Sequence, residues 1–349
     1  MQVRATPPPP GRAPLATSGP GAGGCPPDSG GVSRQGLWRA GRIVASAVML
    51  ALLLPRMNLP SLLPREHHGD TVAFLILGLL TTLAGIVLSA WRWQRVLAVF
   101  DADTRLPSLV SHYLAGQFVG NFLPSTIGGD VLRVSRLSNS SAVPGTDVFA
   151  SVVIERLTGW IVLPLLTLAG LLLSPSLLGL GVASQLAVAL SLGTLLLLAG
   201  ILAAAGSRRM AGRFAANEGW TRFIGAVHLG IDSLRRRPSA TAGIIAVATV
   251  YQLSPVLAAW FATRALGLHL PVVALLAFTP VVAIAQVLPL SLNGLGIREG
   301  AFVLFLGPLG VSTGQAVAVG LIVYALTLAV SLLGAPAFAV GGRSRTVSV

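Results

Sequence analysis

From Leu157 to Gly206 the sequence contains no Asp, Glu, Lys or Arg. A helix needs roughly 20 apolar residues to cross the ~30 Å hydrocarbon core of a bilayer, so this stretch is long enough for two crossings. Pro175 and the glycines at 179 and 181 predict the break between them. Three further segments predict spans because they also lack charge: Thr71–Ala90, Ser239–Thr263, and the chain between Glu299 and Arg343.

Composition supports the same fold class. The chain is 54% hydrophobic and only 10% charged, whereas soluble domains carry about 25% charged residues. An all-α polytopic membrane protein is therefore predicted. The formal net charge is +13, and every basic residue is arginine. Since the arginines lie between apolar runs, the positive-inside rule explains them better than nucleic-acid binding does.

The arginines also predict the orientation and the ends of the domain. Seven lie between residues 206 and 239, and others precede residue 43 or follow residue 342. We therefore expect a cell-membrane protein whose N- and C-termini are both cytoplasmic. The Pro/Gly-rich residues 1–36 are expected to be disordered, residues 37–341 to form one transmembrane domain, and 342–349 to form a tail. Ile43–Leu54 predicts a signal-anchor helix, with a signal peptide as the alternative.

The arginine-rich loop 206–238 contains apolar residues at helical spacing. These are Trp220, Phe223, Ile224, Val227, Ile231 and Leu234. The pattern predicts an amphipathic helix lying in the membrane interface. A solvated, arginine-rich linker is the alternative.

Two segments, 106–144 and 271–310, are apolar at first and are then broken by Pro and Gly and followed by charges. If the neighbouring spans alternate in direction, with the second span ending inside at Arg92 and Arg95, each segment must enter and leave on the same side. The first would enter from the cytoplasm and the second from outside. The expected architecture is about six full spans plus two re-entrant helical hairpins, or eight if hairpins are counted as spans.

Both hairpins share the spacing P-x4-G-x3-R, with Pro124, Gly129 and Arg133 in the first and Pro289, Gly294 and Arg298 in the second. Gly128, Asn293 and Gly296 complete the expected breaks. An odd number of spans per half predicts an inverted repeat, with halves at about 37–175 and 176–341. A helix beginning after each break would direct its N-terminal amides inward, which favours an anion such as phosphate.

Ionised side chains accompany both breaks and the third span. Because charge is costly inside a bilayer, it must be paired or line water. We interpret six residues as substrate-binding candidates, with arginines for a lipid phosphate and carboxylates for cationic parts: Asp130, Arg133, Glu155, Arg156, Arg298 and Glu299. The alternative is a structural one, in which Glu155, Arg156, Arg298 and Glu299 only hold the two halves together.

Three stretches resemble one known family in its own order: Gly116–Arg133, Ser151–Trp160 and Leu288–Phe302. They are similar to the lysylphosphatidylglycerol synthase transmembrane region, the flippase-like membrane domain of bacterial multiple-peptide-resistance proteins. The resemblance covers about residues 38–340. It implies translocation of a phospholipid or glycolipid, such as aminoacyl-phosphatidylglycerol, between leaflets. The chain ends nine residues after Val340, so we do not expect it to carry the aminoacyl-transferase domain of the bifunctional members.

Other functions leave weaker signals. Asp101 and Asp103 form a D-x-D that could hold a metal-bound sugar nucleotide, so a membrane subunit or enzyme of polyprenyl- or lipid-linked glycosylation is the alternative function. A small-solute carrier is a third possibility. No catalytic motif, cofactor or metal site is predicted. The expected partners are a membrane lipid and a separate synthase or glycosyltransferase, not nucleic acid.

Overall fold

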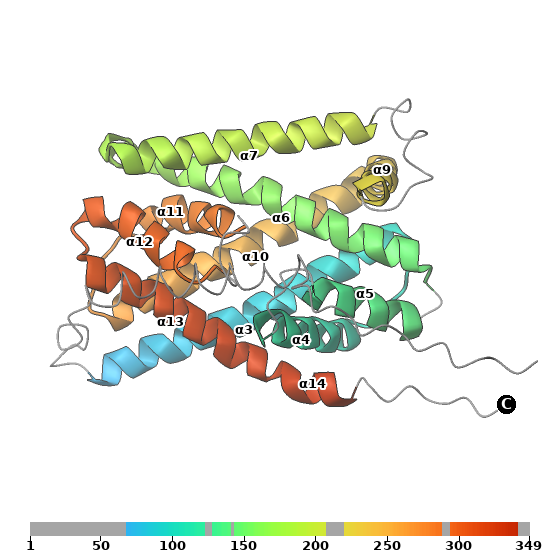
Figure 1. Cartoon of the computed structure of the whole chain (residues 1–349), viewed down its shortest axis with the longest axis horizontal. Coiled ribbons are helices and arrows are strands. Elements are labelled where there is room, and N and C mark those ends of the chain that lie inside the picture. The colour runs from blue at the N-terminus through green and yellow to red at the C-terminus, as the bar shows by residue number, and fades with distance from the viewer. Residues whose placement is uncertain (1–67, 123–127, 141–142, 207–219, 288–293, 341–349) are drawn as a thin grey trace, which may run out of the picture.

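The computed structural model describes residues 68–122, 128–140, 143–206, 220–287 and 294–340. These residues form a bundle of helices (Figure 1). In chain order the helices are α3 (His68–Val99), α4 (Leu106–Phe122), α5 (Gly128–Ser140), α6 (Gly145–Leu173), η2 (Pro175–Gly179), α7 (Val182–Gly206), α9 (Trp220–Arg236), α10 (Pro238–Ala265), α11 (Val272–Ala285), α12 (Ile297–Leu306), η3 (Gly307–Leu309), α13 (Thr313–Leu332) and α14 (Gly334–Val340). The described part contains no strand.

Five of the described helices are long and apolar enough to cross a membrane: α3, α6, α7, α10 and α13. The predicted all-α polytopic membrane fold is therefore confirmed. The uncharged stretch after Leu157 does contain a break, because α6 ends at Leu173 and α7 begins at Val182. The predicted spans 71–90 and 239–263 lie within α3 and α10. The predicted signal-anchor helix and both tails lie outside the described residues.

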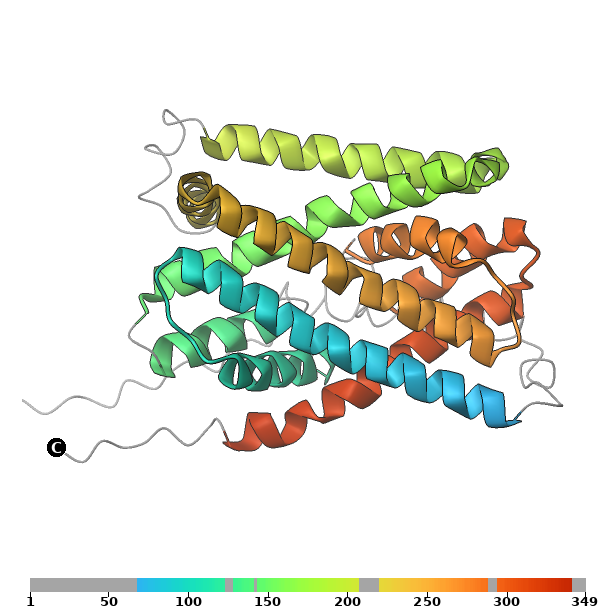
Figure 2. The same cartoon turned by 180° about the vertical axis from the view of Figure 1, so that it is seen from behind.

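Each predicted hairpin contains a pair of short helices. The α4–α5 pair lies toward the end of the bundle where α3 ends and α6 begins, and α11–α12 lies toward the opposite end (Figures 1 and 2). This placement is expected of hairpins that enter from opposite sides. The helix breaks Pro124, Pro289 and Asn293 fall outside the described residues, and the inverted repeat with its half boundaries stays a prediction.

Glycines allow close contact between packed helices. α3 packs along α10, and a Cβ on Gly85 would lie 2.4 Å from the Oγ of Ser254. α11 packs on α6, where a Cβ on Gly170 would lie 2.5 Å from the backbone nitrogen of Ala277. Small residues are favoured at such crossings because packing, not hydrophobic burial, drives helix association in lipid.

The loop 206–238 contains a helix, so its linker interpretation is wrong for α9. This helix is viewed end-on while the spans run across the picture (Figure 2). It packs against α6 and α7; Val227 is fully buried, and Gly230 lies directly against Ile154. Part of the apolar face thus serves to pack α9 on the bundle.

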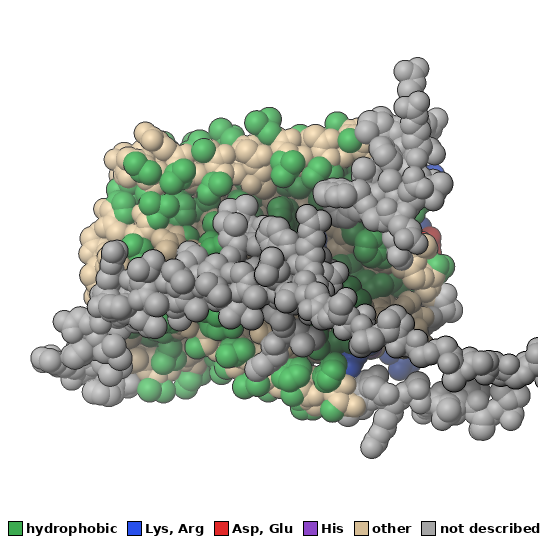
Figure 3. Space-filling model, in the orientation of Figure 1, with side chains coloured by type: hydrophobic (Ala, Val, Ile, Leu, Met, Phe, Trp, Pro, Cys, Tyr) green, Lys and Arg blue, Asp and Glu red, His purple; other side chains and the backbone are tan. Residues whose placement is uncertain are grey.

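Charge is distributed unevenly between the two ends of the bundle. Where described residues are visible in Figure 3, green hydrophobic side chains are spread over the face, and the blue and red ones lie in its right-hand part. The end of α9 and the residue that follows it place three arginines, Arg235–Arg237, at this end. The positive-inside rule predicts that this end faces the cytoplasm.

Candidate functional site

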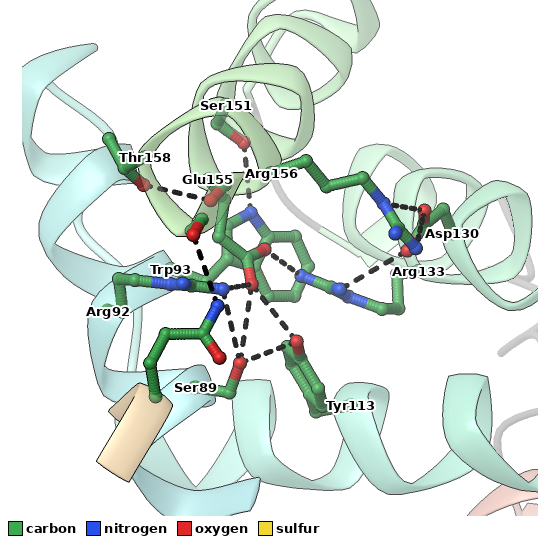
Figure 4. A network of polar contacts seen from close by, with 12 residues as sticks. Ser89, Arg92, Trp93, Tyr113, Asp130, Arg133, Ser151, Glu155, Arg156 and Thr158 are labelled. Atoms are coloured by element: carbon green, nitrogen blue, oxygen red, sulfur yellow. Dashed lines mark hydrogen bonds and ion pairs between the residues drawn. The ribbon is translucent and has the colours of Figure 1, made fainter. Parts of the chain in front are cut away.

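A buried ionic network joins the first hairpin to the spans beside it (Figure 4). Its centre is Glu155 on α6, which is 1% exposed. The Nη2 of Arg92 on α3 lies 2.8 Å from Glu155 Oε1, and the Nη2 of Arg133 on α5 lies 2.5 Å from Oε2. The hydroxyl of Tyr113 on α4 donates to Oε1 at 3.0 Å. One carboxylate thus connects four helices, all from the first predicted half.

Close helix packing and aromatic rings hold this network in place. A Cβ on Gly129 would lie 2.4 Å from the backbone oxygen of Gly116, so α5 approaches α4 more closely than any other residue would permit. The Arg133 guanidinium lies 4.2 Å from the Trp93 ring centroid and 4.0 Å from that of Tyr113. Cation–π contacts of this kind stabilise a desolvated charge.

Asp130 and Arg156 form a second, more exposed pair beside the buried one. Arg156 Nε donates to Asp130 Oδ2 at 2.5 Å, and its side chain is 54% exposed. Asp130 also lies 3.4 Å from Arg133. Four of the six candidate residues are therefore linked to one another in space by ion pairs. Arg136 is directed elsewhere: it donates to the backbone oxygens of Ala337 and Phe338 in α14 at 2.9 and 2.8 Å.

The second hairpin has a different local structure. Its glycines Gly294 and Gly296 adopt positive φ angles of 77° and 86°, which L side chains rarely adopt. Helix α12 begins immediately after them. The fully buried Glu299 accepts from the backbone N–H of Gly296 at 2.6 Å. The prediction that this helix start offers its amides to an anion is therefore wrong for Gly296, because the amide already binds the carboxylate of its own helix.

Arg298 lines a cavity of about 260 Å³ between the two hairpins. We call it the Arg298 cavity. Arg298 Nε donates to Gln286 Oε1 at 3.0 Å, and the guanidinium lies 4.8 Å from the Tyr324 ring centroid. The cavity lining comes from both hairpins and from α10 and α13: Gln117, Asn121, Pro255, Thr279, Val282, Ala283, Gln286, Arg298, Phe302, Val323, Tyr324 and Thr327.

A smaller cavity of about 120 Å³ adjoins the Arg298 cavity and shares Gln117, Pro255, Val323 and Thr327 with it. Ser89 and Tyr113 line its other side, and both contact Glu155. The two cavities therefore lie side by side between the ionic network and Arg298.

A proline interrupts the hydrogen-bond pattern of α10 beside both cavities. Pro255 cannot donate a helical hydrogen bond, which leaves the Tyr251 carbonyl without its helical N–H donor. The Ser254 hydroxyl donates to that carbonyl at 2.8 Å. Pro255 lines both cavities, and Tyr251 and Ser254 line the smaller one. The loss of one helical hydrogen bond is tolerated at membrane depth when such a side chain satisfies the freed group.

A comparison with protein families matches residues 39–334 to the lysylphosphatidylglycerol synthase TM region. The chain belongs to this family. The resemblance found in the three sequence stretches is thereby confirmed. A comparison with curated proteins finds no match. The chain is thus a multi-pass member of a lipid-related, flippase-like family of membrane domains.

Within this family domain, sequence reasoning placed Arg92 at the inner end of a span, and that placement is wrong. Helix α3 continues to Val99, and Arg92 is buried against Glu155. Its position between Trp91 and Trp93 was the sequence feature that could have indicated its burial. The cavity residues Gln117, Asn121 and Gln286 were also missed, because neutral amides in apolar helices give no distinctive pattern.

A third cavity, open and of about 560 Å³, lies at the arginine-rich end of the family domain. Asp101, Asp103, Arg95 and Trp91 are among its lining residues. Asp101 is already paired, since Arg237 Nη2 lies 2.8 Å from its Oδ1. No cluster of three or more His, Cys, Asp or Glu side chains suited to a metal occurs in the part of the chain that the structure describes.

Proposed function

We propose that this family member moves a phospholipid or glycolipid between leaflets, with the headgroup passing through the two adjoining cavities while the acyl chains stay in the bilayer. One observation carries the proposal: a polar cavity containing an arginine lies between two hairpins, midway along the spans. Tyr324 lies eleven residues after Thr313, the first residue of α13. At ~1.5 Å per residue this is roughly half of a ~30 Å hydrocarbon core.

The physical barrier to lipid translocation is the transfer of a charged headgroup out of water. Hydroxyl and amide groups along the cavities can replace part of the headgroup's hydration. The Arg298 guanidinium supplies a positive charge that attracts a phosphate. The volumes of about 120 and 260 Å³ suit a headgroup and not the lipid's tails.

Asp130, Arg133, Glu155 and Arg156 have a supporting part in this proposal. Their ion pairs fix the first hairpin against α3 and α6, so that Gln117 and Asn121 on α4 stay beside the cavity. Arg298 is the residue proposed to contact the phosphate. Glu299 shapes the start of α12 and thereby positions Arg298.

Reconstitution tests the proposal. Purified protein is placed in liposomes containing fluorescent phosphatidylglycerol, and dithionite then quenches the label in the outer leaflet. We expect quenching beyond the outer-leaflet fraction with wild-type protein and loss of this excess with Arg298→Gln. Quenching equal to that of protein-free liposomes, with folded protein present, would contradict translocation.

The open cavity at Asp101 and Asp103 favours a second candidate, a role in lipid-linked glycosylation. It predicts that membranes containing the protein form a lipid-linked sugar when given a sugar nucleotide. The double variant Asp101→Asn, Asp103→Asn should then lose product. Because Asp101 already binds Arg237, we rank this candidate second.

A further inference from the structure

We propose that the open cavity at the arginine-rich end of the bundle binds a phospholipid whose headgroup carries both a phosphate and a terminal ammonium group. We call this cavity, of about 560 Å³, the Arg95 cavity. It shares no described lining residue with the two adjoining cavities proposed for translocation. The lipid is thus a bound constituent and not the transported substrate, and the inference does not depend on translocation.

The ionic side chains of the described lining match such a headgroup in number and sign. They are Arg95, Asp101 and Asp103. Asp101 is neutralised, since Arg237 Nη2 lies 2.8 Å from its Oδ1. Arg95 and Asp103 form no ion pair with each other or with another described residue. One positive and one negative charge therefore remain available, which complement a phosphate and an ammonium group.

The order of these side chains along the cavity matches the order of groups along a phospholipid. Trp91 and Arg95 lie one turn apart on α3, and Asp103 follows in the loop after this helix. From the bilayer outwards, the lining thus presents an indole, a guanidinium and a carboxylate. In a phospholipid of this class the glycerol group lies deepest, the phosphate next and the ammonium outermost. Arg95 is therefore placed for the phosphate and Asp103 for the ammonium.

The depth of the cavity favours a lipid over a soluble phosphate ester. Trp91 lies eight residues before Val99, the last residue of α3, which corresponds to up to ~12 Å along the helix. The headgroup layer on each side of a bilayer is only roughly 5–8 Å thick. A cavity that extends from the loop to Trp91 therefore reaches the edge of the hydrocarbon core. Trp91 is 37% exposed, and tryptophan is enriched at this level of a membrane.

Hydrogen bonds of the chain itself hold the polar end of the cavity in shape. The N–H of Ala102 donates to the carbonyl of Leu97 at 3.1 Å, and Asp101 adopts a positive φ of 57°. This left-handed turn is a common way to end a helix. The side-chain amide of Gln94 donates to the carbonyl of Thr104 at 2.7 Å. The loop that carries the unpaired carboxylate is therefore anchored at both of its ends.

The Arg95 side chain is held on two sides and still accessible. Its guanidinium lies 5.0 Å from the Trp91 ring centroid. Gly243 on α10 leaves room for it, because a Cβ there would lie 2.9 Å from Arg95 Nη1. Arg95 is nevertheless exposed. Its N–H groups can therefore donate to a phosphate without the loss of an existing ion pair.

Lipid retention measured by native mass spectrometry tests the inference. Delipidated full-length protein is mixed with equal amounts of phosphatidylethanolamine and phosphatidylglycerol that carry the same acyl chains. The wild type should retain phosphatidylethanolamine about fivefold better, which is equivalent to ~1 kcal/mol and to one solvent-accessible ion pair. Asp103→Asn should abolish this preference. Asp70→Asn, which removes an exposed carboxylate at the other end of α3, should keep it. Equal retention by the wild type, or an unchanged preference in Asp103→Asn, would overturn the inference.

Photo-crosslinking locates the bound lipid. Phosphatidylethanolamine with a diazirine near the glycerol end of one acyl chain is crosslinked to the protein, and the labelled peptides are identified by mass spectrometry. We expect crosslinks within residues 91–104. Arg95→Gln should reduce them, whereas Arg105→Gln, an exposed arginine of the same loop outside the described lining, should not. Crosslinks confined to residues of the other two cavities would overturn the inference.

Two competition experiments separate the lipid from soluble ligands of related chemistry. Phosphoethanolamine in excess should not displace the lipid, because it lacks the part that lies beside Trp91; displacement would assign the cavity to a soluble phosphate ester. UDP-glucose in excess should not displace it either. Displacement by UDP-glucose would favour the sugar-nucleotide site of the second candidate function and overturn the lipid assignment.

Discussion

Replacing Glu155 by Gln should destabilise the protein more than any other single change in the ionic network. The variant keeps the side-chain shape but removes the negative charge from between Arg92 and Arg133, whose guanidinium groups lie 2.8 and 2.5 Å from the carboxylate. Their side chains are 4% and 5% exposed, so neither can recover solvation by turning to water.

The magnitude follows from this burial. Breaking a buried ion pair by removing one partner costs about 3–5 kcal/mol. At about 2–4 °C per kcal/mol, the melting temperature should fall by roughly 6–20 °C. Arg133→Gln should cost less than Glu155→Gln, because Glu155 would retain Arg92. Arg156→Gln removes an exposed ion pair worth about 0–1 kcal/mol and should lower the melting temperature by at most ~4 °C.

The assay heats detergent-solubilised protein and measures the monodisperse fraction by fluorescence-detected size exclusion. All variants are first checked for insertion into membranes. A Glu155→Gln melting temperature within about 3 °C of wild type would refute the reasoning. A larger fall in melting temperature for Arg133→Gln than for Glu155→Gln would also refute it, since the central carboxylate would then not be the shared partner.

Further predictions concern packing and the tails. Gly129→Ala should destabilise the first hairpin by bringing a methyl group to about 2.4 Å from the Gly116 carbonyl oxygen. Gly120→Ala on α4 is the control, because a Cβ there meets nothing within 4 Å; it should leave stability unchanged or raise it by up to ~1 kcal/mol. Similar melting temperatures for the two variants would contradict this prediction. Arg136→Gln should release α14 and increase its proteolysis or cysteine accessibility, since two hydrogen bonds to that helix are lost. Deletion of residues 2–36 should leave retained lipid and melting temperature unchanged.

The long helices were predictable because a single physical requirement, the absence of charge across a bilayer, determines them. Leu157–Gly206 and Ser239–Thr263 therefore fell close to the observed helices α6, α7 and α10. The break glycines were also found from sequence, although their roles differ. Gly129 permits a close helix contact, whereas Gly294 and Gly296 adopt positive φ angles.

The site was less predictable because side-chain direction depends on tertiary packing. Arg133 and Arg298 share a spacing from their prolines, yet one is enclosed by aromatic rings and the other lines a cavity. In the sequence, Arg92 looks like any other arginine near the end of a span. Only the packing of α5 and α6 beside it shows that it is buried in the ionic network. Glu299 follows Arg298 in the chain but binds its own helix.

If the protein moves lipid as proposed, the bond between Glu299 and Gly296 bears on how the second hairpin holds its fold when the lipid leaves. If the N-terminal amides of a re-entrant helix were hydrogen-bonded only by a bound headgroup, they would lose that partner whenever the headgroup left. Because Glu299 belongs to α12 itself, the Gly296 N–H stays hydrogen-bonded whether or not a headgroup occupies the neighbouring cavity. A transport cycle of the proposed kind would then not have to re-form this hydrogen bond.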